Sequence, residues 1–250
     1  EHTFDRTFIT DRGLDYYFKV YIDGTIVTLP DSNYIEHPLH LRVRIPQVTF
    51  PTKLLAGIYF NLAIPFELEQ STFSSEIFRN FGKNDPFKWR LLRWENNNYI
   101  ELTEKNIFDV PAGYGFWLIS AKERNINFNN ILTNLTNEDF RIRLMPGWNQ
   151  IGNPFMFPIE TKNVVIPQGK NVEKVFWKWN KKNYEIETLS LQPFEGYFIN
   201  NNEETPIDIF IKPIISDLTT LSNNISDLYN LSKSKIDFIL KDESEASDII

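Results

Sequence analysis

The chain has 250 residues, and 42% of them are hydrophobic, which is enough for a sizeable core and for two compact units of ordinary domain size. Its formal net charge of -7 argues against a nucleic-acid partner, because phosphate binding needs a positive field. There is no cysteine, so the sequence excludes disulfides and thiolate metal sites.

Aromatic residues form 15% of the chain, and such large flat side chains suit the pleated surface of a β-sheet. The longest apolar run, residues 54–66, is interrupted by Asn61 and is too short to cross a bilayer, so we expect no membrane insertion. The first residues have neither the basic start nor the apolar region of a signal peptide. We therefore expect the chain to be part of a longer polypeptide.

The N-terminal residues predict a β-hairpin followed by a third strand. Apolar and polar residues alternate over 14–22, Asp23-Gly24 is a hairpin turn, and 25–29 form the return strand. Residues 39–45 predict one more strand, closed by Pro46. The pattern over 14–24 resembles the last two strands of a fibronectin type III or immunoglobulin-like domain. Residues 1–48 are therefore predicted to be the C-terminal strands of such a domain.

Residues 49–140 predict a first β unit. Ser71 and Thr72 ahead of Glu76 indicate a capping box and a short helix over 71–78. Strands are predicted over 87–94 and 99–102, and 111–119 form a turn that leads into a strand buried on both faces.

Residues 141–214 predict a second unit with the same parts in the same order. The matched segments are Gly147-Trp148 with Gly57-Ile58, Pro154-Phe155 with Pro65-Phe66, Trp179 and Tyr184 with Trp94 and Tyr99, and 193–199 with 111–118. We predict an all-β fold of two tandem, related β-sandwich or barrel-like units.

The same residues carry a family resemblance. Residues 89–94, 99–101, 115–119 and the string 147–155 resemble a β module that follows fibronectin or immunoglobulin-like repeats in large secreted or surface-attached bacterial proteins, particularly Bacteroidetes-like ones. The resemblance implies an accessory or adhesive part of an extracellular polypeptide, whose partners are other domains or subunits of a surface assembly. It brings no catalytic residues. The chain departs from that pattern in having no clear C-terminal sorting domain.

Residues 215–250 predict a C-terminal extension. Apolar residues at 218, 221, 225 and 228 indicate a short amphipathic helix, and 236–240 indicate a strand. The acidic residues over 242–248 are interpreted as a solvated tail rather than a calcium loop.

Three tryptophans are the candidates for ligand binding. Trp177 and Trp179 share one face of a predicted strand and are suited to stacking on sugar rings, although burial in the core is the favoured interpretation because Trp179 matches Trp94. Trp89 matches Lys174, a polar residue, and is therefore the better candidate for an exposed aromatic side chain.

Catalytic and metal sites are not predicted. His37 and His40 are three apart on an extended chain and so face opposite sides. Carboxylate pairs such as Glu185 and Glu187 are expected by chance among 33 acidic residues, and the lysines of 170–182 are interpreted as a solvated strand face. There is no phosphate loop or serine-nucleophile motif, and no cofactor is expected.

The sequence favours a non-enzymatic structural or adhesive module of a secreted or cell-surface bacterial protein. The alternative is a carbohydrate-binding accessory module of a secreted hydrolase, with glycans as partners. That alternative requires exposed aromatic rings, so burial of Trp89, Trp94, Trp177 and Trp179 would exclude it. A hydrolase is the least favoured hypothesis, since it needs a carboxylate pair with a raised pKa in a cleft.

Overall fold

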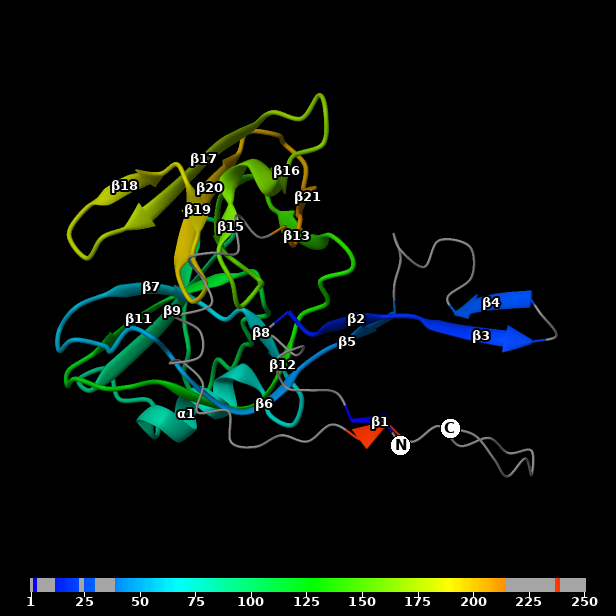
Figure 1. Ribbon diagram of the computed structural model, residues 1–250. Coiled ribbons are helices and arrows are strands. Elements are labelled where there is room, and N and C mark those ends of the chain that lie inside the picture. The colour runs from blue at the N-terminus through cyan, green and yellow to red at the C-terminus, as the bar shows by residue number, and fades with distance from the viewer. Residues whose placement is uncertain (1, 4–11, 23–24, 30–38, 215–236, 239–250) are drawn as a thin grey trace.

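The computed structural model describes residues 2–3, 12–22, 25–29, 39–214 and 237–238 (Figure 1). Antiparallel strands dominate these residues, and the prediction of a mainly β fold is confirmed. No sheet formed by the described residues closes into a barrel, so the barrel-like alternative is wrong and the architecture is sandwich-like. The predicted helix at 218–228 lies outside the described residues.

The first sandwich combines a four-stranded sheet in the order β10-β9-β11-β7 with a three-stranded sheet in the order β6-β12-β8. Its strands are β6 (Arg44–Thr49), β7 (Phe60–Ala63), β8 (Phe66–Leu68), β9 (Trp89–Glu95), β10 (Asn98–Glu101), β11 (Gly115–Ser120) and β12 (Asn127–Thr133). Buried side chains of both sheets, such as Phe116 and Phe128, form one core.

The second sandwich has a four-stranded sheet in the order β14-β20-β17-β18 and a three-stranded sheet in the order β13-β21-β16. Its strands are β13 (Phe140–Leu144), β14 (Gly147–Gly152), β16 (Val164–Val165), β17 (Val172–Trp179), β18 (Tyr184–Glu187), β20 (Gly196–Asn201) and β21 (Ile207–Ile211). A small pair, β15 (Ile159–Glu160) with β19 (Ser190–Leu191), and the 3-10 turn η2 (Thr161–Asn163) complete this half.

The two sandwiches use the same strand order in chain sequence, with β7 in the place of β14, β9 of β17 and β11 of β20. The strand registers then identify equivalent residues. Asn61 pairs with Trp117, and Gln150 pairs with Phe198. Gln150 is therefore called the counterpart of Asn61, and other counterparts are defined by the same registers. Trp148 becomes the counterpart of Tyr59, one position from the match that the sequence suggested.

The helix α1 (Phe73–Phe81) covers the first core and has no equivalent between β16 and β17. Its N-terminus forms the expected capping box, but the partner of Thr72 is Ser75 rather than Glu76. Phe73 and Ile77 are buried in the first core.

The N-terminal strands form separate two-stranded pairs. The strand β3 (Phe18–Ile22) pairs with β4 (Thr25–Leu29), and β2 (Leu14–Tyr16) pairs with β5 (Leu39–Leu41). The predicted strand over 39–45 is divided, because β6 starts at Arg44 and continues through Pro46. Proline is tolerated there since β6 is an edge strand of its sheet. Farther apart in the sequence, β1 (His2–Thr3) pairs with β22 (Asp237–Phe238).

Two side chains from the second half complete the first core. Met156 and Phe194 belong to the cluster that contains Phe50 and Phe66, and the ring centroids of Phe194 and Phe50 are 4.9 Å apart. Phe194 has a φ of 66°, which is unusual for a bulky residue and costs about 1–3 kcal/mol. Burial of the ring offsets that strain, so Phe194 anchors one sandwich to the other.

Replacing this anchor should destabilise the whole protein. We expect F194A to lower the free energy of unfolding by about 3–5 kcal/mol, because the ring leaves a cavity in the first core. The control F87A removes a ring that is 92% exposed and should change stability by less than about 0.5 kcal/mol. Urea denaturation measures both, and equal values for the two variants would contradict the anchoring role.

Candidate functional site

The two four-stranded sheets meet at a junction where counterparts contact each other reciprocally. The Nε1 of Trp94 donates to the backbone oxygen of Trp148 at 2.8 Å, and the Nε1 of its counterpart Trp179 donates to the backbone oxygen of Tyr59 at 3.1 Å. Contacts exchanged in both directions in this way are the signature of an interface with twofold symmetry.

Backbone contacts repeat the same reciprocity. The amide of Ala63 donates to the oxygen of Phe194 at 3.1 Å, and the amide of Gly152 donates to the oxygen of Gly113 at 2.9 Å. Ala63 and Gly152 are counterparts, as are Phe194 and Gly113. The β-bridges Leu62 with Glu195 and Ile151 with Tyr114 form a further equivalent pair.

The centre of the junction requires glycine. A Cβ at Gly152 would lie 2.1 Å from the Cβ of Ala63, and one at Gly196 would lie 2.2 Å from the Oδ1 of Asn61. Beside them, the Nε2 of Gln150 donates to the Oδ1 of Asn61 at 2.6 Å in a buried hydrogen bond. The missing side chains therefore let the two sheets approach closely enough for counterpart amides to bond.

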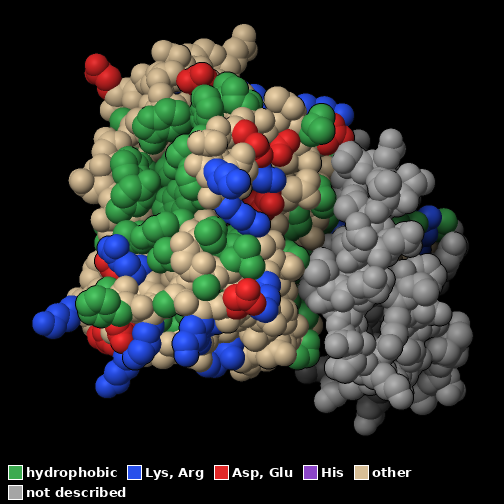
Figure 2. All heavy atoms as spheres, turned by 90° about the vertical axis from the view of Figure 1, so that its left-hand side faces the viewer, with side chains coloured by type: hydrophobic (Ala, Val, Ile, Leu, Met, Phe, Trp, Pro, Cys, Tyr) green, Lys and Arg blue, Asp and Glu red, His purple; other side chains and the backbone are tan. Residues whose placement is uncertain are grey.

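An aromatic cluster extends from the junction to the surface. Trp117 is 7% exposed and lies 5.7 Å from Trp179 between ring centroids, and Trp179 lies 5.2 Å from Tyr184. The members are Tyr59, Trp94, Tyr99, Trp117, Trp179, Tyr184 and Phe198. Tyr99 and Tyr184 are about half exposed. Figure 2 shows hydrophobic side chains gathered on the side of the molecule toward which the β17–β18 hairpin extends.

The hydroxyl of Tyr184 is held in its neutral form. Partial burial is the main cause, and the electrostatic interaction with its counterpart Tyr99 adds to it, so that the pKa of Tyr184 rises to about 12. In the second core, burial raises the pKa of Tyr197 far above its usual range. Neither tyrosine is therefore suited to proton transfer near neutral pH.

Trp89 is 1% exposed, so the expectation of an exposed ring is wrong. Its ring packs against Phe78 and Phe81 of α1 at centroid distances of 6.0 and 5.4 Å, and its Nε1 donates to the oxygen of Lys83. The second half has no helix here. By strand register the counterpart of Trp89 is the half-buried Val172, because a β-bulge between Glu173 and Trp177 displaces the match with Lys174 that the sequence suggested. The large ring at Trp89 thus reflects packing against the helix rather than a ligand.

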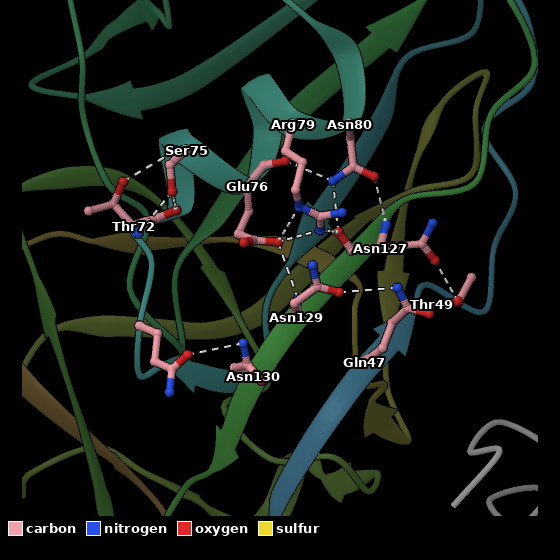
Figure 3. Close-up of polar contacts among 11 residues, drawn as sticks. Gln47, Thr49, Thr72, Ser75, Glu76, Arg79, Asn80, Asn127, Asn129 and Asn130 are labelled. Carbon is pink, nitrogen blue, oxygen red and sulfur yellow. Dashed lines mark hydrogen bonds and ion pairs between the residues drawn. The ribbon is translucent and has the colours of Figure 1, made fainter. Parts of the chain in front are cut away.

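Polar contacts attach α1 to the neighbouring strand β12 (Figure 3). Arg79 and Asn80 both donate to the oxygen of Asn127 at 2.7 Å, and the amide of Asn129 donates to the Oε2 of Glu76 at 3.2 Å. Glu76 also pairs with Arg79. The helix is therefore attached to β12 by its polar face as well as by its apolar one.

Trp177 and Trp179 are half-buried, as is Trp94. They lie on the face of β17 opposite Phe176, which is buried in the second core. The face of β17 that carries the two tryptophans lies toward the junction, and the opposite face packs on the core of the second sandwich. Sequence reasoning did not single out Asn61, Gln150 or Glu195, and it assigned Lys178 to the lysines of a solvated strand face. The only signal was a polar residue, Asn61, inside an apolar run.

Two cavities of related lining flank the junction. Cavity 1 has a volume of about 330 Å³ and is lined by residues that include Phe60, Asn61, Lys178, Trp179 and Glu195. Cavity 2 has a volume of about 270 Å³, and its lining includes the counterparts of these five residues. In the same order they are Asn149, Gln150, Arg93, Trp94 and Tyr114. Both sandwiches contribute to each cavity.

The polar groups of the two cavities differ in what they already bind. In cavity 1 the Nζ of Lys178 lies 2.7 Å from the Oε2 of Glu195, and both side chains keep partial exposure, at 25% and 34%. In cavity 2, Tyr114 bonds the backbone of Arg143. The Oε1 of Gln150 accepts a hydrogen bond from the backbone amide of Trp94, and its Nε2 donates one to the Oδ1 of Asn61.

Among the described residues, no group of three or more His, Asp or Glu side chains is placed to hold a metal ion. Within the same residues, no helix is long and apolar enough to cross a membrane. His37 lies outside the described residues, and His40 is on β5.

Comparison with protein-family models, with curated proteins and with solved structures finds no match for this chain.

The close approach at the junction can be tested by moving one methyl group across it. G152A should lower the free energy of unfolding by about 1–3 kcal/mol through overpacking against Ala63. The double variant A63G/G152A should recover most of that loss, because the methyl group is then supplied from the opposite sheet. Denaturation of the four proteins of this cycle measures the coupling, and strictly additive effects would refute the contact.

Tyr184 should make stability depend on alkaline pH. Its folded pKa of about 12 is above the ordinary value of 10.0, so the stabilisation is complete below pH 10 and is lost as the pH rises toward 12. The tyrosinate absorbance of the wild-type protein minus that of Y184F isolates this hydroxyl. A midpoint near 10 in the difference titration would contradict the raised pKa of Tyr184.

Proposed function

We propose that the chain is a non-enzymatic structural or adhesive module of a secreted or cell-surface bacterial protein, built from an internal duplication of one β-sandwich unit. The observation that carries this proposal is the reciprocal junction. Trp94 and Trp179, Ala63 and Gly152, and Gly113 and Phe194 each take the same position on opposite sides.

The duplication is supported by strand order and contact pattern together. Two unrelated sandwiches have no reason to exchange the same hydrogen bonds in both directions, whereas two copies of one self-complementary surface do so. A junction of this kind joins the units with little freedom between them. Such a joined pair suits a role in holding or spacing other domains, since most relative motion of tandem domains occurs at small, loosely packed interfaces.

The family resemblance supports the location. The string 147–155, which with the two Gly-aromatic strands is among the most specific parts of that resemblance, forms β14 and the turn after it, and β14 lies at the junction. We infer that the resemblance reflects the junction itself. By the same inference, the partners are other domains or subunits of a surface assembly, and the N-terminal strands belong to an immunoglobulin- or fibronectin-like domain.

A second candidate is a carbohydrate-binding accessory module. It is favoured by Trp179, which lines cavity 1 beside Lys178 and Glu195. Trp89 no longer supports it, because its ring is buried. Burial of all four tryptophans would have excluded this candidate. Trp94, Trp177 and Trp179 are only partly buried, so it is not excluded.

Surface location can be tested on intact cells of the organism that makes the chain. Brief treatment with a protease should release peptides from residues 39–214 into the medium, while a cytosolic marker protein stays protected. Recovery of these peptides only after lysis would overturn the surface assignment.

The absence of enzymatic activity needs its own assay. The purified chain should not hydrolyse chromogenic glycosides, esters or peptides above the background of a mock preparation. Hydrolysis that persists through purification and is lost on replacement of one carboxylate would overturn the non-enzymatic proposal.

A further inference from the structure

Cavity 1 has the size and composition of a site for one small ring. Its volume of about 330 Å³ is at the lower end of the range for small-molecule sites. The walls are largely apolar and aromatic, with Phe50, Phe60, Trp179 and Phe194 among them. A few polar groups stand within these walls, which is the usual composition of a ligand site.

The ion pair in cavity 1 keeps unused hydrogen-bonding capacity. Within the described part of the chain, Lys178 spends one donor on Glu195, and an ammonium has three. The Oε2 of Glu195 also accepts from the hydroxyl of Tyr197 at 3.0 Å, while its Oε1 makes no hydrogen bond to a described residue. Free donors and a free acceptor therefore stand side by side.

Asn61 adds a donor to the wall of cavity 1. Its side chain is 92% buried, and its Nδ2 has no hydrogen-bond partner among the described residues. The orientation of the amide is fixed by a chain of bonds, since the amide of Trp94 donates to Gln150 and Gln150 donates to the Oδ1 of Asn61. Because Nδ2 itself is covered, a ligand oxygen reaches it only when a side chain of the wall moves.

Cavity 2 serves as an internal comparison. Its glutamine is one methylene longer than Asn61 and reaches the backbone of Trp94, so both of its polar atoms are used. Its tyrosine replaces Glu195 and bonds to a neighbouring backbone. The two halves thus differ at these two positions, where cavity 2 uses its polar atoms on the protein itself. Its Arg93, the counterpart of Lys178, pairs with Glu95 and keeps only a covered Nε without a partner among the described residues.

We propose that cavity 1 binds one pyranose ring of an oligosaccharide. Each sugar hydroxyl both donates and accepts a hydrogen bond, so two adjacent hydroxyls match the donors of Lys178 and the free oxygen of Glu195. The apolar face of the ring lies against Trp179. This inference deepens the carbohydrate-binding candidate and rests on a binding role for the chain, but it does not depend on where in the cell the chain is found.

The experiment uses the purified chain with its tryptophan side chains labelled with nitrogen-15. Hexasaccharides of glucose, mannose, galactose and xylose are added separately up to millimolar concentration. One of them should shift the indole N–H signal of Trp179, while the signal of Trp94 in cavity 2 should stay in place. The signals are assigned from the variants W179F and W94F.

Four variants assign the binding to cavity 1. K178M and E195Q should weaken binding by about tenfold or more, because K178M removes the charged donor and E195Q removes the charge of the acceptor. The controls K182M and E173Q change exposed residues of the β17–β18 hairpin and of β17, and should alter the affinity by less than about twofold. Thermal unfolding of each variant verifies that it is folded under the conditions of the titration.

Three outcomes would overturn the inference: no shift at Trp179 with any hexasaccharide, a shift confined to Trp94, or unchanged affinity in folded K178M and E195Q. A chain that is released from intact cells yet binds none of the sugars loses this site but keeps the proposed surface role. A chain that binds a sugar but stays inside the cell loses the surface role and keeps the site.

Discussion

The structure depends on the contact between Gly152 and Ala63, where two sheets approach so closely that one methyl group fits and two do not. Every reciprocal contact of the junction follows from that distance. The indole of each tryptophan reaches the opposite backbone, and the amides of Asn61 and Gln150 bond directly, only because the sheets are this close. The aromatic cluster packs beside this junction and extends from it to the surface.

Much of the fold could be predicted because it depends on local sequence patterns. The N-terminal hairpin, the helix start near Thr72 and the matched order of parts each depend on residues that are neighbours in the sequence. The burial of Trp89 could not be predicted in this way. Its environment is made by a helix that the other half lacks, so comparing the two halves misassigned the ring.

The candidate site was beyond sequence reasoning for a related cause. Asn153 is an example. Its side chain is fully buried and forms hydrogen bonds with the backbone of Phe155, Phe157 and Leu191. Backbone partners leave no trace in the sequence, so the abundance of asparagine resembled a compositional bias. The ion pair of Lys178 with Glu195 could not be predicted from the sequence either, because it depends on the register between β17 and β20.

The insertion of Phe194 into the first core has a consequence for synthesis of the chain. All the strands of the first sandwich have left the ribosome once Thr133 has emerged, yet the core still lacks Met156 and Phe194. At ordinary elongation speeds the wait is on the order of seconds, and during it the apolar wall around Phe50 is open to solvent. The nascent first sandwich is therefore a natural client for chaperones until the second one arrives.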